Sequence, residues 1–235
     1  MEQVNRKTLQ QMIEQQVGKW ELAPKPGGGP DRPEFEPVIT VSRLPGCNAG
    51  EIVQKASEKL GFDVFNGKLV ELVAQDANLS QSVAETLDEK QISAVEEWVK
   101  GLVVNRYFSS DNFFFRLSKI VGTIGRHGRA IIVGRGASMM LPPHDCLRVL
   151  LVAPLEVRVD NVVKKFGVPR EDARRRVINR ESDRRAYVRR YFNADMTDPL
   201  LYDIVLNTDG MGIDASADII VSAWKAKQAL RKLKH

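Results

Sequence analysis

Short, continuous apolar runs alternate along this chain with longer segments in which apolar residues recur every three or four positions. The short runs end at small or polar residues, which is typical of strands buried on both faces of a parallel sheet. They lie at residues 38–42, 62–65, 130–134, 147–153 and 203–207. Because segments with helical spacing separate them, the pattern predicts a doubly wound α/β domain with five strands.

An amphipathic helix and a linker are predicted ahead of this domain. Over residues 5–20 the apolar residues fall on one helical face. Residues 23–37 then contain five prolines around three consecutive glycines, a composition that favours neither a helix nor a central strand. We therefore divide the chain into an N-terminal helix at 1–22, a linker at 23–37 and a domain at 38–235. The apolar face of the helix packs either on its own domain or on another subunit, so a homodimer contact stays open.

Helical spacing also fills the long interval between the second and third strands. One helix starts at Gly67, a second is expected to start at Ser80 as its N-cap and to continue to Leu102, and a third is expected to start at Asp111. The phenylalanine triplet at residues 113–115 has no interleaved basic residues. This favours core packing over a platform for stacked bases.

Composition and length exclude several classes of protein. At 235 residues, with 43% hydrophobic and 28% charged residues, the chain has the balance of a soluble globular domain with appendages. No run approaches the roughly 20 apolar residues of a membrane span, and residues 1–20 have no apolar signal-peptide core. We therefore expect a cytoplasmic protein with no membrane partner. Cys47 and Cys146 show neither CxxC spacing nor paired histidines, so we expect reduced thiols and no metal site.

The positive charge of the chain is concentrated in one segment. The net charge is +5, and residues 170–190 hold nine Arg, no Lys and four acids, so the rest of the chain is formally neutral. Pro169 and the acids after it predict the start of a helix. One face of that helix carries three arginines spaced by four residues, and two more lie beside it: Arg176, Arg180, Arg184, Arg185 and Arg189. Guanidinium groups suit the forked recognition of phosphate, whereas a nucleic-acid-coating protein more often spreads its charge over a wide face.

A second candidate for phosphate chemistry is the segment VITVSRLPGCNAGE at residues 38–51. An apolar strand runs there into a turn of small residues and then into a helix, which gathers backbone N–H groups and the positive end of a helix dipole at one point. The usual fingerprint Gly-x-x-x-x-Gly-Lys-Ser/Thr is not met, because Glu51 follows the last glycine, Gly50. The segment therefore predicts an anion cradle that lacks the lysine.

The predicted sheet also has a candidate ligand edge. In a doubly wound sheet, ligands bind outside the carboxyl ends of the strands. The residues that directly follow the five predicted strands are polar, small or basic: Ser42 with Arg43, Asn66, residues 134–136, residues 153–154, and Asn207 with Thr208. Several of these side chains are expected to lie close together at that edge.

Taken together, several segments resemble the cytidylate kinase-like family of P-loop nucleotide kinases. They are ITVSR and GCNAGEI within residues 39–52, IIVGRGA at 131–137, LLVAPLEVRV at 150–159, NRESDRRAYVRRYF at 179–192 and YDIVLNT at 202–208. The resemblance implies a three-layer P-loop nucleotide kinase fold with a five-stranded parallel sheet, a helical acceptor-binding insertion over residues 66–128 and an arginine-rich lid over residues 169–192. It also implies ATP and Mg²⁺ as cofactors and nucleotides as substrates.

The resemblance further implies roles for individual residues. The expected phosphate-binding residues follow the first strand: Ser42, Arg43, Gly46, Cys47, Asn48, Ala49, Gly50 and Glu51. The expected catalytic residues lie in the lid: Arg180, Asp183, Arg184 and Arg185. These arginines would stabilise charge on the transferring phosphoryl group, and Asp183 would orient them or approach the magnesium shell. Arg135 would contact the acceptor nucleotide, and Asn207 with Thr208 would line the base pocket.

One departure from the family pattern leaves the function open. Gly50 stands where the family carries Lys or Arg, and Glu51 replaces the hydroxyl that would ligate Mg²⁺. Either Arg43 or a lid arginine supplies the missing cation, or phosphoryl transfer is weak or lost. The first hypothesis is a kinase that moves the γ-phosphate of ATP to a nucleoside monophosphate or a similar small acceptor. The alternatives are a nucleotide-binding protein without catalysis and, disfavoured by the localised charge, a nucleic-acid-binding protein.

Overall fold

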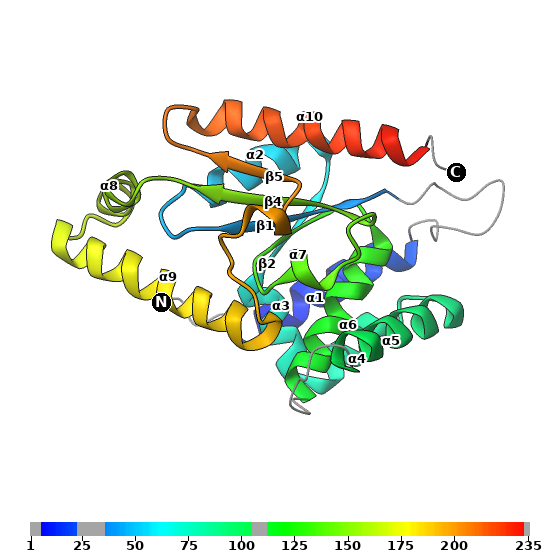
Figure 1. Ribbon diagram of the computed structural model, residues 1–235. Coiled ribbons are helices and arrows are strands. Elements are labelled where there is room, and N and C mark those ends of the chain that lie inside the picture. The colour runs from blue at the N-terminus through cyan, green and yellow to red at the C-terminus, as the bar shows by residue number, and fades with distance from the viewer. Residues whose placement is uncertain (1–5, 23–35, 105–111, 233–235) are drawn as a thin grey trace. The chain divides into compact units, whose positions relative to one another are not determined.

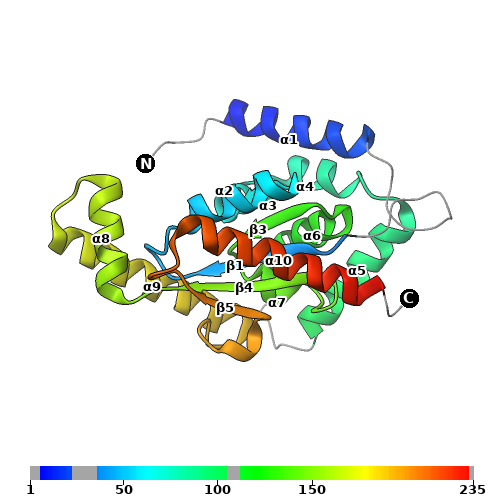
Figure 2. The same cartoon turned by 90° about the horizontal axis from the view of Figure 1, so that it is seen from above.

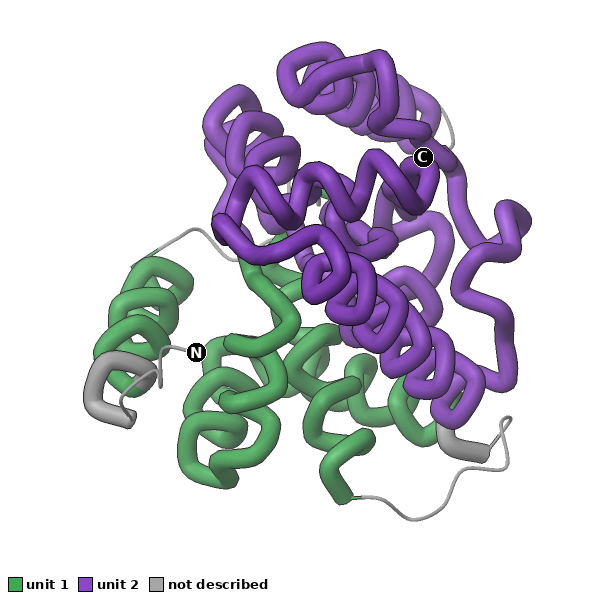
Figure 3. The backbone as a smooth tube through the Cα atoms, turned by 90° about the vertical axis from the view of Figure 1, so that its left-hand side faces the viewer, with its two compact units in different colours: residues 1–36, 65–128 green, residues 37–64, 129–235 purple. Residues whose placement is uncertain are grey.

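The computed structural model describes residues 6–22, 36–104 and 112–232. The chain divides into two compact units, which Figure 3 distinguishes by colour. The sheet unit comprises residues 37–64 and 129–235, and the helical unit comprises residues 1–36 and 65–128. None of the described helices is long and apolar enough to cross a membrane.

The sheet unit is built on a five-stranded sheet with the strand order β2-β3-β1-β4-β5. The strands are β1 (Val38–Arg43), β2 (Asp63–Asn66), β3 (Ala130–Val133), β4 (Cys146–Val152) and β5 (Ile204–Asn207). β1 pairs in parallel with both β3 and β4, and β4 pairs in parallel with β5. β1, β3 and β4 are largely buried, as expected for strands that are covered on both faces. The α/β class and the five strands predicted from the apolar runs are confirmed.

Helices pack on both faces and at one end of this sheet (Figure 1). They are α2 (Ala49–Leu60), α7 (Ala137–Met140), α8 (Leu155–Phe166), α9 (Arg170–Phe192) and α10 (Gly212–Lys232), with a short 3₁₀ helix at Pro199–Leu201. α2 and α10 pack on each other on one face, where the indole Nε1 of Trp224 donates to the carbonyl of Pro37 at 2.5 Å. α7 packs against β1 and β4 on the other face.

The consecutive helices α8 and α9 lie together at the end of the sheet where β1 and β4 finish (Figure 2). A buried apolar cluster joins them, made by Val159 and Val162 of α8 and Ala173 and Val177 of α9. Pro169 immediately precedes α9, as expected for a residue whose fixed φ favours a helix start. The helix predicted over the arginine segment is confirmed.

The helical unit consists of α1 (Arg6–Leu22), α3 (Gly67–Gln75), α4 (Ala77–Ala84), α5 (Glu89–Val104) and α6 (Asn112–His127). α6 packs against α3, α4 and α5, and α1 packs against α4. The indole of Trp20 stacks on the ring of His127, with ring centroids 4.2 Å apart, and lies 5.8 Å from the ring of Phe65. Ile13 and Trp20 are buried whereas Met12 is 47% exposed, so part of the predicted apolar face is covered within this unit.

Other predictions for this part of the chain have mixed outcomes. Phe114 is buried, and Phe115 packs against a small apolar cluster of α5 and the turn before it, in agreement with the expected core packing of the phenylalanine triplet. Two predictions fall outside the described residues, namely most of the linker at 23–37 and the helix cap at Asp111.

The prediction of one helix from Ser80 to Leu102 is wrong, because two helices, α4 and α5, divide this segment. Asp76 caps α4 by accepting hydrogen bonds from two backbone N–H groups of its first turn, while Ser80 is buried inside the helix. At the start of α5, Oδ1 of Asp88 accepts from the N–H of Gln91 at 2.8 Å, and Oε1 of Gln91 accepts from the N–H of Asp88 at 3.4 Å. This capping box starts a new helix, although the apolar residues keep near-helical spacing across the break.

Candidate functional site

The loop between β1 and α2, residues 44–48, has a conformation that depends on its small residues. Gly46 has a φ of +88° and Asn48 a φ of 50°, both in the left-handed region. A Cβ atom placed on Gly46 would lie 2.4 Å from the carbonyl oxygen of Arg158, in the first turn of α8. Glycine is therefore required at position 46, both for its dihedral angle and for the close approach of two backbone segments.

The backbone N–H groups of this loop point to an anion site. Within the described chain, the N–H groups of residues 46–50 donate to no carbonyl oxygen and to no side chain. They lie at the N-terminus of α2, where the helix dipole adds partial positive charge. A cavity of about 240 Å³ adjoins them. Successive N–H groups at a helix N-terminus form an anion-binding nest, which supports the cradle predicted from the sequence.

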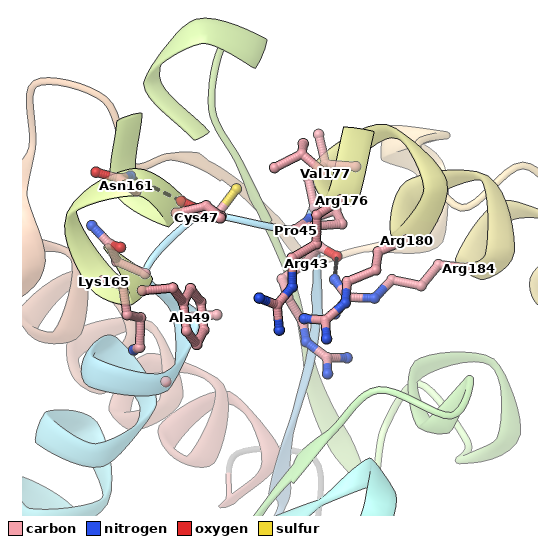
Figure 4. A pocket seen from close by; sticks show the side chains of 16 residues that line it. Arg43, Pro45, Cys47, Ala49, Asn161, Lys165, Arg176, Val177, Arg180 and Arg184 are labelled. Carbon is pink, nitrogen blue, oxygen red and sulfur yellow. Dashed lines mark hydrogen bonds between the residues drawn. The ribbon is translucent and has the colours of Figure 1, made fainter. Parts of the chain in front are cut away.

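The cavity is bounded by the loop, by α8 and by α9 (Figure 4). Its lining residues from the two helices are Asn161, Val162, Lys165, Phe166, Arg176, Val177, Arg180 and Arg184. Figure 4 shows the side chains of Arg43, Arg180 and Arg184 gathered on one side of the cavity and Lys165 on the other. The arginine face predicted on α9 and the predicted loop therefore meet at one cavity.

The arginine side of the cavity carries three positive charges, those of Arg43, Arg180 and Arg184. Burial and the neighbouring charges of Arg184 and Arg135 lower the pKa of Arg43 to about 9. Burial and the charges of Arg180 and Arg135 likewise lower the pKa of Arg184. In the described ranges, no carboxylate forms an ion pair with Arg43, Arg180 or Arg184. Crowded cations of this kind disfavour one another, and a bound anion would relieve that cost.

Helix α8 fixes the loop in place through two polar side chains that the sequence reasoning did not identify. Arg158 is 5% exposed, and it donates through Nε to the carbonyl of Ala153 at 2.9 Å and through Nη1 to the carbonyl of Pro45 at 3.4 Å. Nδ2 of Asn161 donates to the carbonyl of Gly46 at 2.8 Å. The signal available in the sequence was a single basic residue, Arg158, among apolar residues in the segment that follows the fourth predicted strand.

Arg158 also connects α8 to the arginine-rich helix α9. Its Nη1 atom lies 2.9 Å from Oε2 of Glu181, and Oε1 of the same carboxylate accepts from Nε of Arg185 at 3.0 Å. Burial alone would raise the pKa of Glu181, but the hydrogen bond from Arg185 and the charge of Arg158 outweigh burial and lower it. Glu181 is thus an ionised bridge between two arginines.

We expect Glu181→Gln to lower the free energy of unfolding by about 1–2 kcal/mol at neutral pH, because its charge-assisted hydrogen bonds with Arg158 and Arg185 are weakened. The folded-state pKa of Glu181 lies below its ordinary value of 4.5, so the carboxylate stabilises the protein above that pH and stops doing so as the pH falls through the folded-state pKa. Urea denaturation over a pH series would show the difference from wild type shrinking in acid. The exposed Asp183, changed to Asn, is the control; an unchanged difference in acid would contradict an ionic role.

The structure separates the four predicted catalytic residues into two groups. Arg180 and Arg184 line the loop cavity. The guanidinium of Arg185 instead donates through Nη1 to Oδ1 of Asp195 and to the hydroxyl of Thr197, both at 3.1 Å, in addition to its bond with Glu181. Asp183 is exposed and does not line the loop cavity. In this part of α9, the carboxylate that pairs with the neighbouring arginines, Arg158 and Arg185, is that of Glu181.

The other predicted residues lie at the carboxyl ends of the strands. Gly134 leaves space for the side chain of Arg43, because a Cβ atom on residue 134 would lie 2.2 Å from Nη1 of Arg43. Arg135 has a φ of 54°, and its guanidinium lies 5.6 Å from the ring centroid of Tyr187. The hydroxyls of Ser42 and Ser138 are 3.3 Å apart. At the end of β5, Asn207 and Thr208 do not line the loop cavity, and the N–H of Thr208 donates to the carbonyl of Val152 at 2.8 Å.

Cys47 in the loop and Gly50 in the first turn of α2 supply neither a nucleophile nor a cation. Both cysteines are free and buried, and burial raises the pKa of Cys47 to about 11, so its thiol is protonated at neutral pH. Gly50 is exposed, and a Cβ atom there would meet nothing within 4 Å. Glu51 forms an ion pair with Lys165 of α8. The loop therefore contributes backbone amides, and no cationic side chain, to the cavity.

A parallel sheet whose first strand ends in an anion-binding loop, faced by an arginine-rich helix, defines the class of P-loop phosphate-binding proteins. The chain belongs to the cytidylate kinase-like family, whose model matches residues 38–210. The resemblance noted in the sequence is thereby confirmed.

Curated relatives agree with this assignment, and a solved structure shares the fold. The chain is 28% identical over 198 residues to the cytidylate kinase of Methanopyrus kandleri, covering 79% of this chain and 92% of that one. It is also 28% identical over 190 residues to the cytidylate kinase of Methanocaldococcus jannaschii, covering 79% and 96%. The crystal structure of an uncharacterized protein from Eubacterium ventriosum has the same fold, with a TM-score of 0.65, 17% identity, and coverage of 81% of this chain and 99% of that one.

Proposed function

We propose that this protein is a phosphotransferase that moves the γ-phosphate of ATP to a nucleoside monophosphate or a similarly small phosphate acceptor. The observation that carries the proposal is the cavity in which the loop amides face Arg180 and Arg184. Membership of the cytidylate kinase-like family supports the same reaction class.

The proposed mechanism assigns each side of the cavity one task. The N–H groups of residues 46–50 bind the donor phosphates, and the positive end of α2 adds to that attraction. Arg180 and Arg184 stabilise the charge that develops on the transferring phosphoryl group. Mg²⁺, when it is bound to the nucleotide, neutralises phosphate charge. No covalent intermediate is required, which agrees with the protonated state of Cys47.

Acceptor binding is proposed for the neighbouring strand ends. The charge of Arg135 lowers the pKa values of Arg43 and Arg184, so these three cations act on one region. An acceptor phosphate held there would lie beside the donor phosphates, as in-line transfer requires. Asn207 and Thr208, at the end of β5, stay the proposed contacts to a base.

The proposal is tested by coupled measurement of ADP release from ATP and Mg²⁺ with the purified full chain. The acceptor panel consists of CMP, dCMP, UMP, AMP and GMP, and the cytidine nucleotides are included because the curated relatives are cytidylate kinases. We expect ADP release that depends on at least one acceptor. Folded protein that gives no turnover with any acceptor would eliminate the kinase.

A second candidate function is nucleotide binding without catalysis. Gly50 and Glu51 favour it, because they stand where the family carries a cation and a hydroxyl, and nothing else in the loop replaces them. This candidate predicts heat of ATP binding in calorimetry together with no transfer to any acceptor. Efficient turnover in the coupled assay would eliminate it.

A further inference from the structure

Lys165, near the C-terminus of α8, is the cation that faces the loop from the side opposite the arginines. It lines the cavity beside the loop and forms an ion pair with Glu51, in the first turn of α2 (Figure 4). Gly50, the residue before Glu51, brings no side chain to the same place. The ammonium group of Lys165, which comes from α8, therefore lies near Gly50, where the loop and α2 provide no cationic side chain.

The position of Lys165 is set by the same face of α8 that holds the loop. Arg158 and Asn161, which come seven and four residues earlier, donate to the carbonyls of Pro45 and Gly46. Residues four and seven positions apart share one face of a helix, so Lys165 extends from this face over the cavity. The adjacent Lys164 does not line the cavity, because each residue turns the helix by about 100°.

The ion pair between Lys165 and Glu51 is one that a phosphate group can displace. The side chains are 50% and 41% exposed, and exposed pairs of this kind are weak. A lysine ammonium offers three hydrogen-bond donors as a point charge, so it can turn from the carboxylate to a phosphate oxygen. A triphosphate on the loop amides would lie close to Glu51 and would carry more negative charge than that carboxylate.

We propose that Lys165 supplies, from α8, the cation that the loop lacks at Gly50, and that it exchanges its ion pair with Glu51 for a direct contact with the phosphates of the bound nucleotide. The inference rests on the proposed function, because it concerns the same phosphate site. It also assigns Glu51 a role: in the empty site this carboxylate holds Lys165 at the cavity.

Calorimetric titration of ATP into five variants of the full chain, one of which is Arg180→Met, tests this exchange. Lys165→Met is expected to weaken ATP binding by at least about tenfold, whereas Lys164→Met, which removes the same charge outside the cavity, is expected to bind as wild type does. Glu51→Gln is expected to bind ATP more tightly than wild type. In the Glu51→Gln background, Lys165→Met is still expected to weaken binding, because the proposed contact is with the phosphate.

Three outcomes separate the possibilities. If Lys165→Met weakens binding in the wild-type background but not in the Glu51→Gln background, Lys165 only neutralises the carboxylate and the direct contact is overturned. If Lys165→Met binds ATP normally while Arg180→Met does not, Lys165 has no role and the proposed function stands. If folded wild-type protein binds no ATP, the proposed function itself fails. Urea denaturation of each variant confirms that it is folded.

Discussion

Arg184→Met is expected to lower kcat for phosphoryl transfer by about 10³-fold, the range found for arginines that stabilise this transition state. The guanidinium of Arg184 lines the cavity and donates through Nη1 to the carbonyl of Arg43 at 2.9 Å, which fixes its position before any ligand binds. Burial and like charges lower its pKa, yet it stays protonated at neutral pH. Such a preorganised charge acts most strongly on the charge that develops during transfer, so kcat should fall more than the KM for ATP rises.

The measurement is the coupled assay with whichever acceptor turns over fastest. Arg175→Met is the matched control, because Arg175 lies on the same helix, is 75% exposed and pairs with Asp172 away from the cavity. Arg184→Lys separates the effect of charge from that of geometry, because lysine keeps the positive charge but lacks the planar guanidinium group with its two parallel donors. We expect this variant to be more active than Arg184→Met but less active than wild type. An Arg184→Met variant that kept most of the wild-type kcat would remove this residue from the reaction.

The periodicity of the sequence predicted the strands and the arginine face because both are local properties. In a strand, consecutive apolar residues such as Ile131 and Ile132 point to opposite faces of the sheet, so a continuous apolar run indicates a strand that is buried on both faces. The predicted runs did form the sheet. A four-residue repeat places Arg176, Arg180 and Arg184 on one face whatever that face contacts. The break between α4 and α5 was missed because it depends on the capping box of Asp88, which apolar spacing does not contain.

The interior of the site could not be predicted in the same way. Arg158 is buried because carbonyls from two loops and a carboxylate from α9 converge on it, and two of these partners, Pro45 and Glu181, lie 113 and 23 residues away in the sequence. Whether Asp183 or Glu181 is the acid that pairs with the neighbouring arginines depends on which face of α9 packs on α8. Two helical positions differ by about 200° around the axis, and only tertiary packing settles which of them faces inward.

The same distinction applies to the missing loop cation. The sequence left two sources for it, Arg43 or a lid arginine. The structure adds Lys165, which the sequence could not place because its relation to Glu51 spans more than a hundred residues. Arg43 lies against Gly134 and beside Arg184, so its charge acts on the side of the cavity opposite Lys165. A polyphosphate on the loop would therefore meet cations on both sides, although the loop itself carries none.

Gly46→Ala is expected to have the largest effect on stability, a loss of about 2–5 kcal/mol in the free energy of unfolding, and to abolish ATP binding. A φ of +88° is unfavourable for any residue with a Cβ atom, at a cost of roughly 1–2 kcal/mol. The new methyl group would also lie 2.4 Å from the carbonyl oxygen of Arg158, which belongs to the backbone and cannot rotate away. Relieving this clash moves the loop from α8, at a further cost of roughly 1–3 kcal/mol.

Gly50→Ala is the matched control in the same loop and helix. A Cβ atom at Gly50 meets nothing within 4 Å, and the residue lies in the first turn of α2 without a left-handed φ. Alanine there is expected to leave stability unchanged or to raise it by up to about 1 kcal/mol, because glycine costs more conformational entropy in a helix. Urea denaturation and ATP calorimetry of both variants make the comparison. Equal effects of the two substitutions would mean that the contact between Gly46 and α8 does not hold the loop, and that the anion nest needs no support from that helix.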